Sequence, residues 1–353
     1  MMPKINIAFA WPGLPDYASR CIRAVIDTRS VNVTVLATTA SVPIKGVEQS
    51  LGQSVTWVKA EDQTVSWSSL NLERPDLLFL GGYATPSFNA LAKETRNAGG
   101  KTVLMADNHC PRSRKDRLLS ALWHRFKHRR RFDGVFVPGR SGRQLARLWG
   151  YDDPIIWEGL YGADPALFQN STPITKRPNA MIFVGQFIDR KNVQGLVEAF
   201  GRFADTHNQW TLTLCGSGPL KDHLPRHPAI TIHDFVQPKD LAKLMAEHRV
   251  LILPSLEEHW GLVVHEAALS GCALVLSDQV GAADDLACPS NAVLCRAGDH
   301  KALEDAFVTL SRWDDNAWAV AEDDSRRLAA QFSPAVFASA VAAMTAHFWG
   351  TLA

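Results

Sequence analysis

Short apolar runs recur along the chain, and a segment with helical periodicity follows each of them. This alternation is typical of a parallel β-sheet whose strands are joined by crossover helices. We therefore predict an α/β protein made of two doubly wound units with six strands each. The expected strands are 5–10, 31–37, 55–60, 76–81, 102–107 and 134–139 in the first half, and 181–186, 210–216, 229–235, 250–255, 273–278 and 292–297 in the second.

The two sets of strands define two domains, predicted at 1–168 and 176–333. Between them, 169–179 is rich in turn-forming residues and lacks an apolar period, so we interpret it as a linker. A last helical pattern, in 334–353, has no strand after it and can cap either domain, with the first as our assignment. Doubly wound sheets bind ligands at the carboxyl ends of their strands, so the loops there carry the candidate chemistry.

Composition excludes several functions. The 353 residues include 37 Lys or Arg and 36 Asp or Glu, and this net charge of +1 disfavours a nucleic-acid binder. No run reaches the ~18 apolar residues of a membrane span, and no secretory signal is recognised, so we expect a cytoplasmic protein. The six cysteines form no C-x-x-C pair, and no His or Cys pair has the spacing of zinc ligands, so no metal site is predicted.

The segment 254–271, PSLEEHWGLVVHEAALSG, has the most specific pattern. A strand ends in Pro-Ser, an acidic loop follows, and a helix is expected from Leu262 until Gly271. Glu258 then lies in the loop and Glu266 about one turn into the helix. Carboxylates accept hydrogen bonds and the N–H groups at a helix start donate them, which suits sugar hydroxyls. The alternative is a solvated Glu258 and a Glu266 that only complements the helix dipole.

Two further loops follow predicted strands. In VGQFIDRKN (184–192), Arg190 and Lys191 precede a helix and can hold a diphosphate together with its N–H groups, or form a solvated basic turn. In LCGSGPL (214–220), Gly216 allows close approach to a ligand, or forms a plain turn. No G-x-G-x-x-G follows any strand, which disfavours a nicotinamide-dependent dehydrogenase.

These motifs resemble the C-terminal domain of the retaining glycosyltransferases of family 4, which have the GT-B fold. GQFIDRKN (185–192), CGSGP (215–219), PS (254–255) and EHWGLVVHEA (258–267) have the family's order and spacing. EGLYGADPALF (158–168) is similar to the family's signature before the linker. The resemblance implies two Rossmann-like domains facing a central cleft, with a nucleotide-sugar donor bound mainly by the second.

The resemblance also implies roles for individual residues. Lys191 would hold the diphosphate, Glu266 the ribose, and Glu258 the transferred sugar. Gln186 stands where the family usually has an arginine, and Arg190 is expected to replace that charge. The expected donor-binding set is Gly13, Gln186, Arg190, Lys191, Gly216, Glu258, Trp260, Gly261, Leu262 and Glu266, with Trp260, Gly261 and Leu262 acting through their backbone.

The first half resembles the family less. Gly13 is the one glycine in a loop that is glycine-rich in family members. His109 follows the strand 102–107 and looks like the family's histidine near the reacting sugar, the alternative being a surface or capping histidine. We assign catalytic roles to His109, Glu258 and Lys191, and we expect no covalent nucleophile, metal or cofactor. The site's task is to stabilise a diphosphate leaving group and an oxocarbenium-like centre.

The segment 112–131 differs from the rest of the chain in charge, with nine Lys or Arg against one Asp. Leu118, Leu119, Leu122, Trp123 and Phe126 follow a helical spacing, so a basic amphipathic helix is predicted. One hypothesis is contact with an anionic membrane, peripheral at the inner face, as polybasic clusters make. In the alternatives the apolar stripe joins the core, or the acceptor is itself anionic.

We conclude from the sequence that the protein is a retaining glycosyltransferase of the hexosyltransferase type. It is predicted to move a sugar from a nucleotide-diphosphate sugar to a glycan or lipid-linked acceptor, in polysaccharide or glycolipid biosynthesis. Two alternatives stay open. Gln186 and the glycine-poor first loop favour a non-catalytic sugar-nucleotide-binding protein, and a GT-B nucleotide-sugar epimerase would share the architecture.

Overall fold

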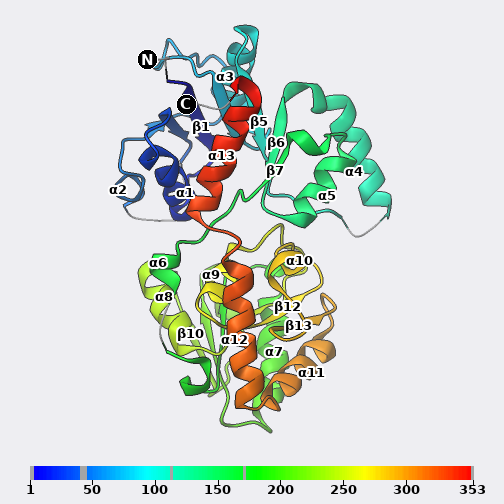
Figure 1. Cartoon of the computed structure of the whole chain (residues 1–353). Helices are drawn as coiled ribbons and strands as arrows, with labels where there is room; N and C mark the ends of the chain where they lie inside the picture. Colours follow the sequence, from blue (N-terminus) through cyan, green and yellow to red (C-terminus); the bar gives the residue numbers. More distant parts are fainter. Residues whose placement is uncertain (1–3, 40–45, 112–113, 170–171, 351–353) are drawn as a thin grey trace. The chain divides into compact units, whose positions relative to one another are not determined.

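The structure, a computed structural model, describes residues 4–39, 46–111, 114–169 and 172–350. It divides into two compact units, Met1–Gly162 with Phe332–Ala353, and Ala163–Gln331. The chain therefore passes between the units twice. The C-terminal helix belongs to the first unit, whose sheet it covers in Figure 1.

The first unit is built on a seven-stranded parallel sheet with the order β3-β2-β1-β4-β5-β6-β7. Because β1 pairs with both β2 and β4, the strand order reverses beside it, and such switch points are where doubly wound sheets bind ligands. The strands are β1 (Asn6–Trp11), β2 (Asn32–Ala37), β3 (Thr56–Trp57), β4 (Leu77–Gly81), β5 (Lys101–Met105), β6 (Gly134–Val137) and β7 (Ile156–Glu158), and the helices are α1 (Asp16–Asp27), α2 (Val47–Leu51), α3 (Pro86–Asn97), α4 (Arg114–Lys127), α5 (Arg140–Leu148) and α13 (Pro334–Trp349).

The prediction of six strands in this half was wrong by one. The seventh strand, β7, has only three residues and pairs with β6 at the edge of the sheet, so its apolar signal is too short to stand out. The strand predicted at 55–60 is reduced to the two residues of β3.

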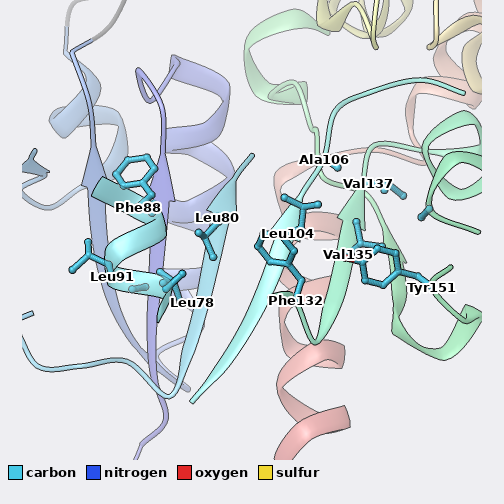
Figure 2. Close-up of a cluster of buried hydrophobic side chains, with 14 of the residues drawn as sticks. Leu78, Leu80, Phe88, Leu91, Leu104, Ala106, Phe132, Val135, Val137 and Tyr151 are labelled. Carbon is cyan, nitrogen blue, oxygen red and sulfur yellow. The ribbon is translucent and has the colours of Figure 1, made fainter. Parts of the chain in front are cut away.

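Alternate residues of the strands face two different helical layers. On one face Leu78 and Leu80 of β4 pack with Phe88 and Leu91 of α3, as Figure 2 shows. On the other face Phe9 stacks on Phe79 with ring centroids 4.7 Å apart. Both faces are therefore buried, which is why these strands are continuously apolar.

The second of these faces is covered by α13. The ring of Phe337 lies 5.8 Å from that of Phe9 and 5.1 Å from that of Phe136, and α13 packs along α1. The turn before α13 fits closely against Gly162, where an added Cβ would lie 2.3 Å from the carbonyl carbon of Ser333. The last helix is thus a structural part of the N-terminal unit.

The second unit has a six-stranded parallel sheet with the order β10-β9-β8-β11-β12-β13, as many strands as predicted. Its best predicted helix, 193–203, forms as α7 with its apolar face buried. The strands are β8 (Ala180–Val184), β9 (Thr211–Cys215), β10 (Ile230–His233), β11 (Val250–Leu253), β12 (Ala273–Ser277) and β13 (Ala292–Cys295), and the helices are α6 (Pro165–Phe168), α7 (Val193–Ala204), α8 (Pro238–Glu247), α9 (Leu262–Leu269), α10 (Ala283–Leu286), α11 (His300–Ser311) and α12 (Asp315–Ala329).

The segment 169–179, predicted as a linker, is packed against the second unit, apart from 170–171, which lie outside the described residues. Ile174 is fully buried, and its N–H donates to Oε2 of Glu322 at 3.0 Å. The buried guanidinium of Arg177 donates to the carbonyl of Ser270 at 2.7 Å. Turn-forming composition indicated the irregular backbone but not these anchors.

Length and composition make Asp315–Trp349 a candidate membrane span. The structure divides this stretch into α12 and α13, of 15 and 16 residues, which belong to different units. Each is shorter than the ~20 residues that cross a bilayer, and each buries one face in its own unit.

Candidate functional site

Lys191 and Glu258 form an ion pair at the carboxyl ends of β8 and β11. Lys191 ends a single 3-10 turn after β8, and Glu258 lies in the loop between β11 and α9. Their side chains are only 12% and 11% exposed, and the hydroxyl of Ser255 lies 3.4 Å from the same Glu258 oxygen. A charge pair this shielded from water interacts more strongly than one on an open surface.

Backbone contacts hold these two loops together. The N–H of Leu256 donates to the carbonyl of Arg190 at 2.8 Å, and the Arg190 guanidinium donates to the carbonyl of Glu257 at 2.9 Å. Asn192, in the left-handed region at φ +53°, donates from its side-chain amide to the carbonyl of Pro254 at 3.3 Å. The guanidinium of Arg190 therefore bridges the loops as well as supplying a charge.

The loop that carries Glu258 is also fixed to the loop after β12. The backbone N–H of Glu258 donates to the carbonyl of Gln279 at 3.1 Å, and the backbone carbonyl of Glu258 accepts from the N–H of Gly281 at 3.0 Å. Trp260 is buried, and its carbonyl accepts from the N–H of Ala282 at 2.9 Å. The Glu258 carboxylate is consequently presented by a backbone held on two sides.

Helix α9 begins at Leu262, after Gly261 at φ +86°. An added Cβ on Gly261 would lie 3.1 Å from both Cγ of Glu258 and Cδ2 of Leu253, so glycine meets a conformational and a steric requirement. Glu266 lies about one turn into the helix and is half-buried. The loop and helix boundaries thus match the prediction, including Gly271 in the left-handed region after the helix.

Gly216 lies where two loops of the second unit come into contact. An added Cβ on Gly216 would lie 1.9 Å from the carbonyl oxygen of Gly185, and one on Gly218 would lie 2.5 Å from the carbonyl oxygen of Phe187. The N–H of Phe187 also donates to the carbonyl of Ser217 at 2.8 Å. The glycines therefore let two loops of the protein touch, and the side chain of Gln186, between these contacts, is exposed.

The other two predicted site residues belong to the first unit. Gly13, at φ +69°, lies in the loop between β1 and α1, and its N–H donates to the hydroxyl of Thr38 at 3.3 Å. His109 is half-buried in the segment after β5, next to Cys110, whose N–H donates to the hydroxyl of Ser141. The structure thus brings Lys191 into contact with Glu258 and ties Arg190 to the loop of Glu258. Gly13 and His109 occupy separate loops of the first unit.

A cavity of about 260 Å³ opens in the first unit at the carboxyl ends of β1, β4 and β5. Its walls combine aromatic rings with a few polar groups. They are formed by Trp11, Pro12, Pro15, Tyr17, Gly81, Gly82, Tyr83, Leu104, Met105, Ala106, Asp107, Asn108, Leu160 and Tyr161. This composition fits a small polar ligand with an apolar face, such as a sugar ring.

The buried hydroxyl of Tyr161 organises the polar end of this cavity. Burial raises the pKa of Tyr161 well above its ordinary value, and the neighbouring Tyr17 and Asp107, both hydrogen-bonded to it, raise it further. The rings of Tyr17 and Tyr161 meet edge to face at 5.1 Å. Tyr161 is therefore a neutral hydrogen-bonding group and cannot act as a base at neutral pH.

Sequence reasoning missed this cavity. It named Gly13 and His109, whereas the described lining contains Trp11 and Asp107, each two residues earlier in the chain, and Tyr161 from the segment after β7. The usable signal was that Trp11 ends β1, and that Tyr83 and Asp107 are the second residues after β4 and β5, respectively. In the described part of the chain, no group of three or more His, Cys, Asp or Glu side chains is arranged to hold a metal ion.

Residues 178–312, which include all six strands of the second unit's sheet, match the family model described as glycosyl transferases group 1. An uncharacterized glycosyltransferase of Methanocaldococcus jannaschii, MJ1607, is 28% identical over 141 residues, which are 38% of this chain and 34% of that protein. Glycogen synthase of Mycobacterium tuberculosis is 32% identical over 174 residues, 47% of this chain and 42% of the synthase. The chain thus spans less than half the length of these curated relatives.

The crystal structure of Anabaena Alr3699/HepE in complex with UDP-glucose superposes with a TM-score of 0.75 over 97% of this chain and 99% of that one, at 15% identity. The chain has the GT-B fold. In GT-B terms, the Lys191–Glu258 pair lies in the domain that matches the family model, and the aromatic cavity lies in the other domain.

Proposed function

We propose that the protein is a retaining glycosyltransferase that moves a sugar from a nucleotide-diphosphate sugar to a glycan or lipid-linked acceptor. The observation that carries the proposal is the shielded Lys191–Glu258 pair beside the start of α9, inside the domain that matches glycosyl transferases group 1. Anabaena Alr3699/HepE, which shares the fold, binds UDP-glucose.

The residues divide the chemistry between them. A lysine ammonium has three donors, so Lys191 can keep its contact with Glu258 while it donates to a phosphate oxygen. As the bond between the anomeric carbon and the diphosphate breaks, that charge opposes the negative charge that develops on the leaving group. Glu258 would accept hydrogen bonds from sugar hydroxyls, and Glu266 from the ribose.

In a retaining transfer the new bond to the acceptor oxygen forms on the face from which the diphosphate leaves. We assign no covalent nucleophile to the protein. The proton of the acceptor hydroxyl passes to His109 or to the leaving phosphate, and a backbone carbonyl can assist by accepting a hydrogen bond from that hydroxyl. Positioning and charge stabilisation then supply the rate acceleration without a metal or another cofactor.

The test is turnover of a panel of nucleotide-diphosphate sugars with and without candidate acceptors, with the anomer of the product assigned by NMR. Glu258→Gln should lower kcat by roughly tenfold or more because it removes a charge at the reacting sugar. Glu247→Gln, at an exposed position of α8, is the matched control and should leave kcat unchanged.

Chelation with EDTA should leave the rate unchanged. Binding without any turnover would contradict the proposal in favour of a non-catalytic protein. Conversion of the donor sugar into its epimer without acceptor would contradict it in favour of an epimerase.

A further inference from the structure

The outer face of α4 is an exposed apolar surface. Twelve large apolar side chains are exposed in the described chain, and five of them lie on this helix. Phe126 is 88% exposed and Leu118 61%. At ~100° per residue the five fall within an arc of about 140°, so they form one stripe along the helix. We refer to Leu118, Leu119, Leu122, Trp123 and Phe126 as the α4 stripe.

The opposite side of α4 is fixed to the first unit, so the stripe cannot turn inward. The fully buried ring of His124 stacks on Trp149 with centroids 4.0 Å apart and an interplanar angle of 8°. The indole N–H of Trp149 also donates to the hydroxyl of Ser120 at 2.9 Å. The interpretation in which the stripe joins the core is therefore wrong.

The stripe is flanked by cations. Arg125 and Lys127 lie on its two sides in helical projection and are exposed, and neither pairs with a carboxylate among the described residues. The Lys127 ammonium lies 5.2 Å from the ring centroid of Trp123. The segment 112–131 carries nine Lys or Arg and one Asp in a chain of net charge +1, although 112–113 lie outside the described residues.

We infer that α4 is a docking surface for an anionic lipid bilayer. An exposed apolar stripe enters the interface between headgroups and acyl chains, while flanking cations meet anionic headgroups. A protein partner would account for the α4 stripe alone, by covering it. An anionic bilayer accounts both for the stripe and for the excess of cations beside it.

The same helix adjoins the cavity of the first unit. Tyr83, which lines the cavity, stacks on His128 just after α4 at 4.2 Å and lies 5.6 Å from Trp123 of the stripe. Docking through α4 therefore brings the cavity close to the lipid surface. The inference about the acceptor rests on the proposed function: if the cavity receives the acceptor, that acceptor is carried by a lipid.

The experiment is sedimentation of the full chain with vesicles of neutral phosphatidylcholine, alone or mixed with phosphatidylglycerol, at low and high salt. Leu122→Ser/Phe126→Ser removes part of the stripe, and Arg125→Gln/Lys127→Gln removes cations. Leu294→Ser/Val320→Ser and Lys239→Gln/Lys243→Gln are the matched controls at exposed positions of the second unit. Circular dichroism melting of every variant reports that both units are folded.

We expect the parent and both controls to sediment with the anionic vesicles and to be released by salt. Partitioning of Arg125→Gln/Lys127→Gln onto anionic vesicles should fall roughly 25-fold, about fivefold per cation. Partitioning of Leu122→Ser/Phe126→Ser should fall about tenfold or more. Equal sedimentation of the parent with neutral and with anionic vesicles would overturn the inference, and so would no sedimentation with anionic vesicles. So would a dimer in light scattering that Leu122→Ser/Phe126→Ser dissolves. These outcomes do not depend on turnover, so they stand apart from failure of the proposed function.

Discussion

At the scale of single residues, the loops that carry the charged groups of the candidate site also contain glycines that close packing requires. Lys191 and Glu258 are placed by hydrogen bonds between backbone groups of their own loops. Gly216 lets two of those loops touch at a distance no side chain allows. A change at a glycine here therefore acts on the position of the charged groups as well as on stability.

Gly216→Ala should lower the free energy of unfolding of the second unit by about 2 kcal/mol or more, because the new Cβ would overlap the carbonyl of Gly185. Denaturant unfolding measures the change. Gly201→Ala is the matched control: it lies within α7, where an added Cβ has only an ordinary contact at 3.6 Å. It should raise stability by about 0.5–1 kcal/mol. Equal effects of the two variants would contradict the packing described for Gly216.

At the same scale, the donor-side candidates could be located in the fold from the sequence because they lie close together along the chain. Glu258, Gly261 and Glu266 share one loop and the helix that follows it, so local periodicity locates them. The cavity was missed because Trp11, Tyr83, Asp107 and Tyr161 come from four distant segments. Only the strand order makes those segments neighbours.

At the scale of elements, α4 shows what periodicity can and cannot decide. Apolar spacing predicts an amphipathic helix over this segment, and the helix forms at Arg114–Lys127. The apolar stripe, however, faces outward, while the polar residues Ser120 and His124 face the unit. A hydrophobic stripe indicates a buried surface only when a partner within the fold is available, and here the aromatic cluster around Trp149 occupies the inner side.

The inner side of α4 makes stability depend on pH. Burial, with the nearby cations, lowers the pKa of His124 to about 3 and that of His128 to about 4. Their pKa values in the unfolded chain are near 6.5, so between pH 6.5 and 4 the unfolded state binds more protons. The stability that the two neutral histidines contribute is therefore fully present above pH 6.5, and it is lost progressively as the pH falls from there through the folded pKa values of about 4 and about 3.

His124→Phe keeps a stacking ring on Trp149 and removes one of these titrating groups. The loss of unfolding free energy of the first unit between pH 6.5 and 4.5 should be smaller in this variant than in the parent, as chemical denaturation at each pH measures. His223→Phe, at an exposed position of the second unit, should keep the slope of the parent. An unchanged slope in His124→Phe would contradict a neutral, buried His124.

At the scale of the whole molecule, the chain begins and ends in the same unit. The assignment of the last helix to the first domain could not be argued from its apolar pattern, because an apolar helix without a following strand can cover either sheet. Phe337 decides the matter by packing between Phe9 and Phe136. The two units nevertheless have separate cores, so damage in one should remain local.

Phe337→Ala should destabilise the first unit by roughly 3–5 kcal/mol, since it leaves a cavity in a layer that is fully buried. Hydrogen exchange should rise in β1 and β6 and stay constant in β8 and β11. Trp349→Ala, at the exposed end of the same helix, is the control and should change neither the stability of the first unit nor the hydrogen exchange of these strands. Faster exchange throughout the second unit would show that the two cores are coupled.

The central claim is that the second unit binds a nucleoside diphosphate through Lys191. Calorimetric titration of UDP, GDP, ADP and CMP tests it on the parent, on Lys191→Met and on Lys243→Met, a lysine exposed on α8. We predict that one diphosphate binds the parent and Lys243→Met equally, and that Lys191→Met binds it about 10- to 100-fold more weakly, the value of a charge-assisted hydrogen bond. Equal affinity in Lys191→Met, or no diphosphate bound by the parent, would contradict the account.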